Sequence, residues 1–195
     1  MGARPSRART LVLSGLGLIV AALLLAGALR AFVVQTFTVP TASMEPTLHA
    51  GQRVWVWRPA DLAHTVERGD LVVIDGRGSF IAAHRPDLPH QVAGWFGLGP
   101  RDVFYVKRVI GVAGDRVTCC SPDGRLKING KAVDEPYVTL AQKASKQTFD
   151  VEVPAGRIWL MGDNRDDSTD SRALLGSPGG GMIDQRTVLG TVIGH

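Results

Sequence analysis

The chain has 195 residues, 23 of them glycine, and a formal net charge of +4 at pH 7. This length allows one domain with a hydrophobic core and excludes two large ones. Four arginines and no acidic residue lie within residues 1–30, so the positions after Arg30 carry equal numbers of basic and acidic side chains. A nucleic-acid-binding function loses its main support, because the basic character belongs to the N-terminal segment alone.

The first predicted element is the uncharged segment 10–29, which is rich in Leu, Val, Ala and Gly. As a helix it would be about 30 Å long, the thickness of the hydrocarbon core of a bilayer. We predict a transmembrane anchor at 10–30, with the basic residues 1–9 in the cytoplasm and residues 31–195 as a domain on the outer face of the membrane. A secretory signal removed near residues 26–28 is the alternative, but the apolar run is longer than such signals usually are.

Short extended segments dominate the chain after the anchor. Runs rich in β-branched residues predict strands at 32–39, 54–57, 71–74, 103–112, 151–153, 157–161 and 188–193. Segments 126–128 and 131–133 flank Asn129-Gly130, a pair typical of two-residue hairpin turns. Residues 75–102 are interpreted as a loop-like insertion. The predicted fold class is mainly β, a β-rich domain preceded by one N-terminal transmembrane helix.

Two further groups of residues carry expectations. The only cysteines, Cys119 and Cys120, are neighbours. Adjacent cysteines rarely fit disulfide geometry and two thiols do not complete a zinc site, so we predict unpaired thiols and no metal. Tryptophans can enter a membrane interface. For Trp55 and Trp57 ordinary packing is nevertheless the preferred interpretation. For the patch of Trp95 and Phe96, membrane contact and ordinary packing are about equally favoured.

Hydrolytic motifs built on histidine are not evident. None of the five histidines lies in a recognisable nucleophile or base motif, and the sequence contains neither Gly-x-Ser-x-Gly nor His-Glu-x-x-His. A histidine base is unsupported rather than excluded.

Ser43 lies in a short loop between Pro40 and Pro46. Proline fixes φ, so the two prolines stiffen the loop and hold the hydroxyl on a rigid support. Thr41 could direct a second hydroxyl at the same place. By composition alone an ordinary Ser/Thr/Pro turn is the favoured interpretation.

Lys107 lies within the predicted strand 103–112, where alternation places it on the face of Tyr105 and Val109 and places Arg108 on the other. Such a lysine can reach water at a strand edge. It can also be buried, which lowers the pKa of an ammonium group and supplies a neutral amine near pH 7. Only the neutral amine can accept a proton from a serine hydroxyl.

The segment 162–172 (GDNRDDSTDSR) is strongly charged. A solvated loop is the plainest interpretation. A calcium loop is disfavoured by the missing terminal glutamate and by two arginines. A network of ion pairs that fixes a loop beside a site is the third interpretation, with Ser168 placed to hydrogen-bond near the lysine.

Together these segments resemble bacterial type I signal peptidases, in the compact form found in Gram-positive bacteria. The matching pieces are 43–48 (SMEPTL), 68–73 (RGDLVV), 106–111 (VKRVIG) with Gly114-Asp115, and 162–172. The resemblance implies that Ser43 is the nucleophile and Lys107 the general base. It also implies an oxyanion hole formed by the Ser43 backbone N–H and the Thr41 hydroxyl.

The same resemblance implies that Ser168 orients the Lys107 amine. Two ion pairs, Arg108 with Asp163 and Asp170 with Arg172, are expected to support the site. The expected activity is removal of signal peptides from exported preproteins at the bilayer, by cleavage after small residues through an acyl-enzyme, without a metal or organic cofactor.

Other functions stay open at this point. A Ser/Lys protease dedicated to a single substrate, such as a pilin or a conjugation protein, would carry the same residues. A non-catalytic anchored binding module would use the polar segments only for folding. Self-cleaving repressors share the Ser/Lys arrangement, but the apolar segment stands here in place of their DNA-binding domain.

Overall fold

The protein was studied as a computed structural model, which describes residues 13, 15–22, 34–58, 66–81, 104–139 and 141–194. Residues 13 and 15–22 of the predicted anchor are helical, and the rest of 10–30 lies outside the described residues. In the described ranges we find no helix with the length and hydropathy that crossing a membrane requires. Most of the predicted insertion at 75–102, with Trp95 and Phe96, also lies outside them.

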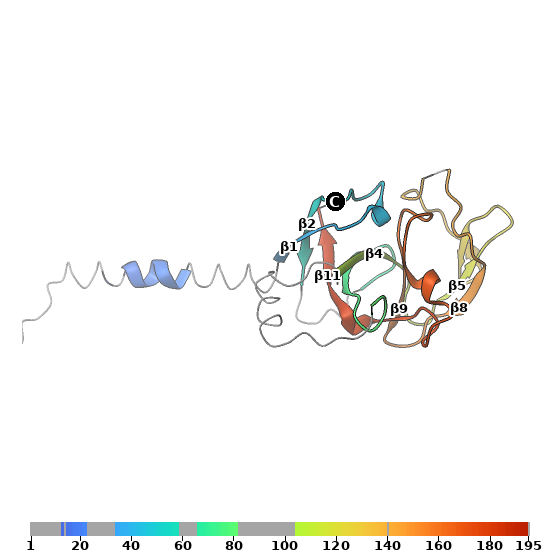
Figure 1. Ribbon diagram of the computed structural model, residues 1–195. Helices are drawn as coiled ribbons and strands as arrows, with labels where there is room; N and C mark the ends of the chain where they lie inside the picture. The colour runs from blue at the N-terminus through green and yellow to red at the C-terminus, as the bar shows by residue number, and fades with distance from the viewer. Residues whose placement is uncertain are drawn as a thin grey trace, which may run out of the picture.

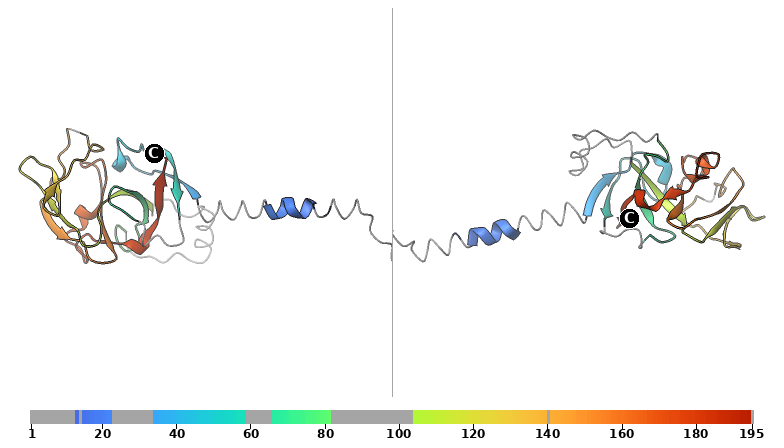
Figure 2. Two further views of the ribbon diagram at one scale, coloured as in Figure 1. Left: turned by 180° about the vertical axis from the view of Figure 1, so that it is seen from behind. Right: turned by 90° about the horizontal axis from the view of Figure 1, so that it is seen from below.

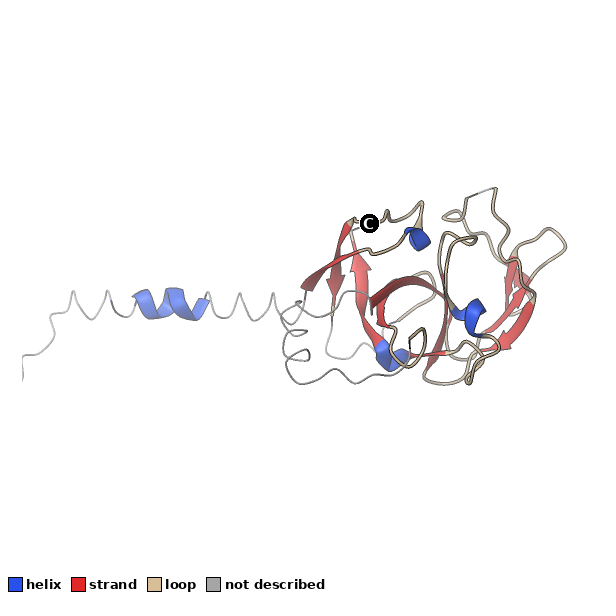
Figure 3. Ribbon diagram, in the orientation of Figure 1, coloured by secondary structure: helices blue, strands red, loops and turns tan. Residues whose placement is uncertain are grey.

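The described part of the chain is mainly β, as predicted (Figure 3). A seven-stranded sheet has the order β1-β2-β11-β3-β4-β9-β10, and all its neighbours are antiparallel. Its strands are β1 (Val34–Thr38), β2 (Arg53–Trp57), β3 (Leu71–Asp75), β4 (Phe104–Gly111), β9 (Arg157–Met161), β10 (Ile183–Asp184) and β11 (Val188–Ile193).

A second sheet of four strands has the order β7-β6-β5-β8. It consists of β5 (Arg116–Cys119), β6 (Leu126–Ile128), β7 (Lys131–Ala132) and β8 (Phe149–Glu152). The turn between β6 and β7 holds Asn129 and Gly130 at φ of 53° and 80°, as expected for a two-residue hairpin turn. Figure 1 shows β1, β2 and β11 at one end of the domain and β5 and β8 at the other, and the views in Figure 2 agree.

One hydrophobic cluster joins the two sheets. Trp159 and Met161 of the large sheet pack with Val117, Leu126 and Phe149 of the small one. The chain passes between the sheets at Gly111, where an added Cβ would lie 2.7 Å from Val117 Cγ2. A glycine is therefore required for the close approach of β4 to the second sheet.

Most of the predicted strands are present, and β5 and β10 were missed. β10 has only two residues, and β5 includes a charged residue and two hydroxyl or thiol residues among its four. Neither offers the run of β-branched residues on which the predictions depend.

The prediction of unpaired thiols is wrong, because the structure joins Cys119 and Cys120 in a disulfide. Cys119 is the last residue of β5 and is buried in the cluster that joins the sheets.

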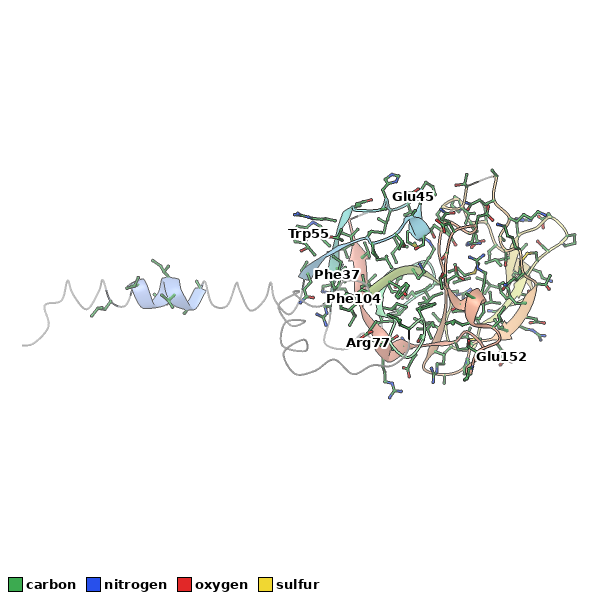
Figure 4. The ribbon with its side chains drawn as sticks, in the orientation of Figure 1. Phe37, Glu45, Trp55, Arg77, Phe104 and Glu152 are labelled. Atoms are coloured by element: carbon green, nitrogen blue, oxygen red, sulfur yellow. A yellow bond between two sulfur atoms is a disulfide. The ribbon has the colours of Figure 1, made fainter. Side chains whose placement is uncertain are left out.

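The preferred interpretation of Trp55 and Trp57 as ordinary packing residues is also wrong. Their side chains are 47% and 41% exposed, on the face of β2 opposite the buried Val54 and Val56. Figure 4 shows Trp55 at the outside of the sheet and Phe37, on neighbouring β1, directed toward Phe104 in the interior. Alternation along β2 thus places Arg53, Trp55 and Trp57 on one exposed face.

Candidate active site

Ser43 lies in the short 3-10 helix η1 (Ala42–Met44), which follows β1 after Pro40. The neighbouring side chains of Met44 and Leu48 are fully buried in the core cluster below β1 and β2. These apolar residues fix the turn from beneath, so the Ser43 side chain, itself only 6% exposed, has a rigid support. We call residues 40–48, which carry the predicted nucleophile, the nucleophile turn.

Lys107 is near the middle of β4, between β3 and β9, where it is opposite Val72. Its side chain is 2% exposed, and Nζ lies 2.6 Å from Ser43 Oγ of the nucleophile turn. The structure therefore brings together two predicted residues that are 64 positions apart in sequence. Lys107 Nζ also lies 5.8 Å from the Tyr105 ring centroid, as expected from the shared strand face.

Burial lowers the pKa of Lys107 from 10.5 to about 8. The negative charge of Asp170 opposes this effect, Arg172 supports it, and Asp163 and Asp167 oppose it more weakly. At pH 7 an amine with this pKa is neutral in roughly one molecule in ten. In that form the Ser43 hydroxyl can donate its hydrogen to Nζ across the short contact.

The Thr41 hydroxyl donates to Ser43 Oγ at 3.0 Å. Thr41 is exposed, and it occupies the N-cap position of η1 in an extended conformation. Two hydrogen-bonding groups, Thr41 Oγ1 and Lys107 Nζ, thus converge on the serine oxygen.

The charged segment 162–172 lies beside this pair. Arg108 donates two hydrogen bonds to the Asp163 carboxylate, at 2.8 and 2.6 Å, and both side chains are buried. The Thr47 hydroxyl donates to the same carboxylate at 2.5 Å. Asp163 therefore links β4 to the far end of the nucleophile turn, a link for which Thr47 gave no separate signal in the sequence.

The second ion pair joins two residues that are close in sequence. Arg172 donates to both oxygens of the buried Asp170 carboxylate, at 2.8 and 2.7 Å. Burial by itself raises the pKa of Asp170, but the hydrogen bonds and charge of Arg172 and the Gly162 N–H bring it below its ordinary value. Asp170 is thereby kept ionised at the start of η4 (Ser171–Leu174).

Ser168 lies close to the Asp170–Arg172 ion pair, but its hydroxyl makes no hydrogen bond to it. Its hydroxyl contributes to the low pKa of Asp170, yet among the described residues no partner lies in hydrogen-bonding geometry with the buried Oγ. An added Cβ on Gly162 would lie 2.2 Å from Ser168 Oγ and 2.5 Å from the Ser43 carbonyl oxygen. Glycine at 162 therefore allows Ser168 and the nucleophile turn to approach, and the predicted role of Ser168 stays a prediction.

Further contacts to the site come from residues that the sequence did not single out. The Asn164 backbone N–H donates to the Ser43 carbonyl at 3.1 Å, and its side-chain Nδ2 donates to the Ala42 carbonyl at 3.2 Å. The Tyr137 ring stacks on the Arg108 guanidinium at 3.9 Å. Asn164 lies within the segment already noted for its charge, whereas Tyr137 lies in a region with no recognisable pattern.

The described residues contain no group of three or more His, Cys, Asp or Glu side chains placed to hold a metal ion. The chemistry available at this site from the described side chains is that of a hydroxyl, an amine and their hydrogen-bonding partners.

Comparison with known proteins shows a clear similarity. Residues 12–194 match the family described as signal peptidase, peptidase S26. Signal peptidase I of Bacillus licheniformis is 38% identical over 181 residues, covering 89% of this chain and 82% of the relative. Signal peptidase I S of Bacillus subtilis (strain 168) is 36% identical over 182 residues, with the same two coverages. A solved signal peptidase I from Enterococcus faecalis V583 is 23% identical, with a TM-score of 0.43, over 65% of this chain and 96% of that one.

The burial of Lys107 predicts a pH-dependent cost in stability. The unfolded chain binds more protons than the folded one between pH 8 and 10.5, so the cost is complete below about pH 8 and absent above about pH 10.5. Replacing Lys107 with methionine, which keeps the apolar stem, should therefore raise the free energy of unfolding at pH 7 by up to about 3 kcal/mol. Urea unfolding of both proteins across this pH range measures the difference.

Lys131→Met, at an exposed position of β7, is the control, and it should change stability by less than about 0.5 kcal/mol at every pH. A Lys107→Met variant that is less stable than the wild type at pH 7 contradicts the prediction. A gain that does not decline between pH 8 and 10.5 contradicts it as well.

Proposed function

This chain belongs to the signal peptidase family, peptidase S26, and we propose that it is a Ser/Lys serine endopeptidase that removes signal peptides from exported preproteins. The observation that carries the proposal is the 2.6 Å contact between Ser43 Oγ and the buried Lys107 Nζ. A non-catalytic binding module would have no need to bury an amine against a hydroxyl, because such burial costs stability.

In the proposed first step neutral Lys107 accepts the Ser43 hydroxyl proton while Oγ attacks the scissile carbonyl. The carbonyl oxygen becomes an oxyanion, which the Ser43 N–H and the Thr41 hydroxyl stabilise by hydrogen bonds. Thr41 Oγ1 is 3.0 Å from Ser43 Oγ, close enough for its hydroxyl to turn from the serine toward a bound carbonyl. The Lys107 ammonium group then gives its proton to the leaving amine, and an acyl-enzyme results.

In the second step the same amine, neutral again, accepts a proton from water, which attacks the acyl-enzyme. Collapse of the second oxyanion releases the product as a carboxylic acid, which then ionises in water, and the Lys107 ammonium group returns its proton to Ser43 Oγ. Ser168 is proposed, by family membership, to orient the amine; its buried hydroxyl makes no hydrogen bond to a described residue and lies near enough to Asp170 to lower the pKa of that carboxyl. The two ion pairs, Arg108–Asp163 and Asp170–Arg172, hold the segment that carries Ser168. Cleavage after small residues is part of the proposal by family membership.

The protein is further proposed to be anchored in the bacterial cytoplasmic membrane through residues 10–30, with residues 1–9 inside and 31–195 on the outer face. The exposed face of β2 supports this. Trp55 is opposite Thr36 of β1 and Ile193 of β11, and Trp57 is opposite Val34 and Thr191. β1 begins four residues after Arg30, so these side chains lie close in sequence to the membrane segment, where tryptophan is favoured.

Loss of either member of the pair should abolish cleavage. Ser43→Ala removes the nucleophile and Lys107→Met removes the base, so each should lower kcat on a preprotein by about a thousand-fold or more. The measurement is cleavage of several unrelated preproteins by the detergent-solubilised full chain. Ser177→Ala, at an exposed serine, serves as the control and should retain wild-type activity. Cleavage by Ser43→Ala would exclude this serine as nucleophile, and cleavage of one preprotein only would indicate a dedicated protease.

The rate should rise with pH as the amine loses its proton. Because burial brings the pKa of Lys107 to about 8, the ascending limb of kcat/KM should have its midpoint near pH 8. A bound substrate that excludes more water should move the limb of kcat to lower pH. The profile is measured under single-turnover conditions, so that product release does not mask the limb. A midpoint near pH 10 would mean that the amine titrates as if exposed.

The membrane-facing tryptophans can be tested in vesicles whose acyl chains carry bromine, a short-range quencher of indole fluorescence. The Trp95→Phe variant keeps Trp55, Trp57 and the fully buried Trp159, and its emission should be strongly quenched. The matched variant with Phe at 55, 57 and 95 keeps only Trp159 and should be quenched little. Equal quenching of the two variants would show that Trp55 and Trp57 do not reach the bilayer.

A further inference from the structure

A segment between β7 and β8 lies against the charged segment 162–172, although its sequence carries no recognisable motif. Its residues are 134–139 and 141–147. Glu135 accepts two hydrogen bonds from the buried Arg165 guanidinium, at 2.9 and 2.6 Å. The Ala144 carbonyl accepts a third at 3.1 Å. These contacts fix the segment beside residues 162–167, next to the nucleophile turn.

The side chain of Gln142 makes two hydrogen bonds across this contact. Its Oε1 accepts from the Arg165 backbone N–H at 3.0 Å, and its Nε2 donates to Asn164 Oδ1 at 2.8 Å. The first of these fixes the orientation of the amide, because a backbone N–H can only donate and the atom facing it must be the oxygen. The NH₂ group of Gln142 is therefore the one directed at Asn164.

The same reasoning fixes the amide of Asn164. The Gln142 NH₂ group can only donate, so the Asn164 atom that faces it is the oxygen, and Nδ2 is left to donate elsewhere. It donates to the Ala42 carbonyl at 3.2 Å. The Asn164 backbone N–H donates to the next carbonyl, that of Ser43, at 3.1 Å. Asn164 thus holds the carbonyls on both sides of the Ser43 residue.

The Ala42 carbonyl shares a peptide plane with the Ser43 N–H. In a trans peptide the two groups point in opposite directions, so an interaction that holds one sets the direction of the other. The Ala42 carbonyl also accepts from the Glu45 N–H at 3.0 Å, which leaves this plane restrained by two donors. The Ser43 N–H is the backbone donor of the oxyanion hole proposed above.

We infer that Gln142 is a positioning residue, which acts through the Asn164 amide to aim the Ser43 N–H at the oxyanion. This inference rests on the proposed function. Gln142 does not touch the reacting atoms. It acts on the step in which negative charge develops on the substrate carbonyl oxygen, because the Ser43 N–H that it helps to aim stabilises that charge. Loss of its NH₂ group would free the Asn164 amide to rotate and to place an oxygen against the Ala42 carbonyl.

Two substitutions separate the contacts of Gln142. Gln142→Met keeps the length of the side chain and removes both hydrogen bonds, whereas Gln142→Glu keeps the acceptor for Arg165 N–H and removes the donor to Asn164. Both should lower kcat about ten-fold, below the hundred-fold or greater loss typical of a deleted oxyanion donor, with KM changed less than about two-fold. The pH midpoint should stay at its wild-type value, because Lys107 is untouched. The exposed residue Gln147 provides the control Gln147→Met, with wild-type kcat.

A peptide aldehyde gives a second readout. Addition of the Ser43 hydroxyl across the aldehyde C=O bond forms a hemiacetal, and the former carbonyl oxygen occupies the oxyanion position. Its affinity should fall in the Gln142 variants by the same factor as kcat/KM. Amide hydrogen exchange supplies a readout that needs no catalysis: the Asn164 N–H, which donates to the Ser43 carbonyl, should exchange faster in Gln142→Met than in the wild type.

The possible failures are distinguishable. Cleavage by Ser43→Ala would overturn the proposed function, while faster exchange in Gln142→Met would still support the positioning link. Wild-type kcat and aldehyde affinity in Gln142→Met, beside an inactive Ser43→Ala, would overturn the positioning role alone. A Gln142→Glu variant with wild-type kcat would also overturn it, since the acceptor for Arg165 and not the donor to Asn164 would then be the important contact.

Discussion

The structure depends on a lysine amine kept away from water against a serine hydroxyl. Lys107 Nζ is 2.6 Å from Ser43 Oγ in a side chain that is almost fully buried, and burial lowers its pKa to about 8. A lysine in an interior strand of a sheet is costly to bury, because its charged form loses hydration. In the proposed mechanism the same loss supplies a base near neutral pH without a histidine, so the cost in stability and the proposed capacity for catalysis have one physical origin.

That contact requires the nucleophile turn to be held on several sides. Met44 and Leu48 hold it from the core, Thr47 is bound to the Asp163 carboxylate, and Asn164 holds its backbone. Since a hydrogen bond of this length tolerates little displacement, a turn held only by its prolines would not keep Oγ in place. The charged segment 162–172 therefore serves mainly to hold the nucleophile turn in a fixed position relative to β4.

The sequence predicts the parts of this arrangement that follow from local patterns. Strand alternation places Lys107 on the correct face, and the run of β-branched residues predicts β4 itself. The contacts of Thr47, Tyr137 and Gln142 were missed because each is a single polar residue whose partner is distant in sequence. The disulfide between Cys119 and Cys120 was missed because general geometry argued against it. The packing of Trp55 was predicted wrongly because valine and tryptophan alternate along β2, so both faces of the strand are apolar there and the sequence does not show which face is buried.

The ion pairs have an electrostatic consequence beyond support. Asp163 and Asp170 both raise the pKa of Lys107, and Arg172 lowers it. An unpaired carboxylate in this buried surrounding would favour the ammonium form and remove the base. Asp163 is paired with Arg108 and Asp170 with Arg172, so the carboxylates can fix the loop while Arg172 opposes part of the effect of Asp170 on the amine. The arginines thus allow a charged scaffold to stand beside a lysine that loses its proton in the proposed mechanism, whereas carboxylates alone would oppose that loss.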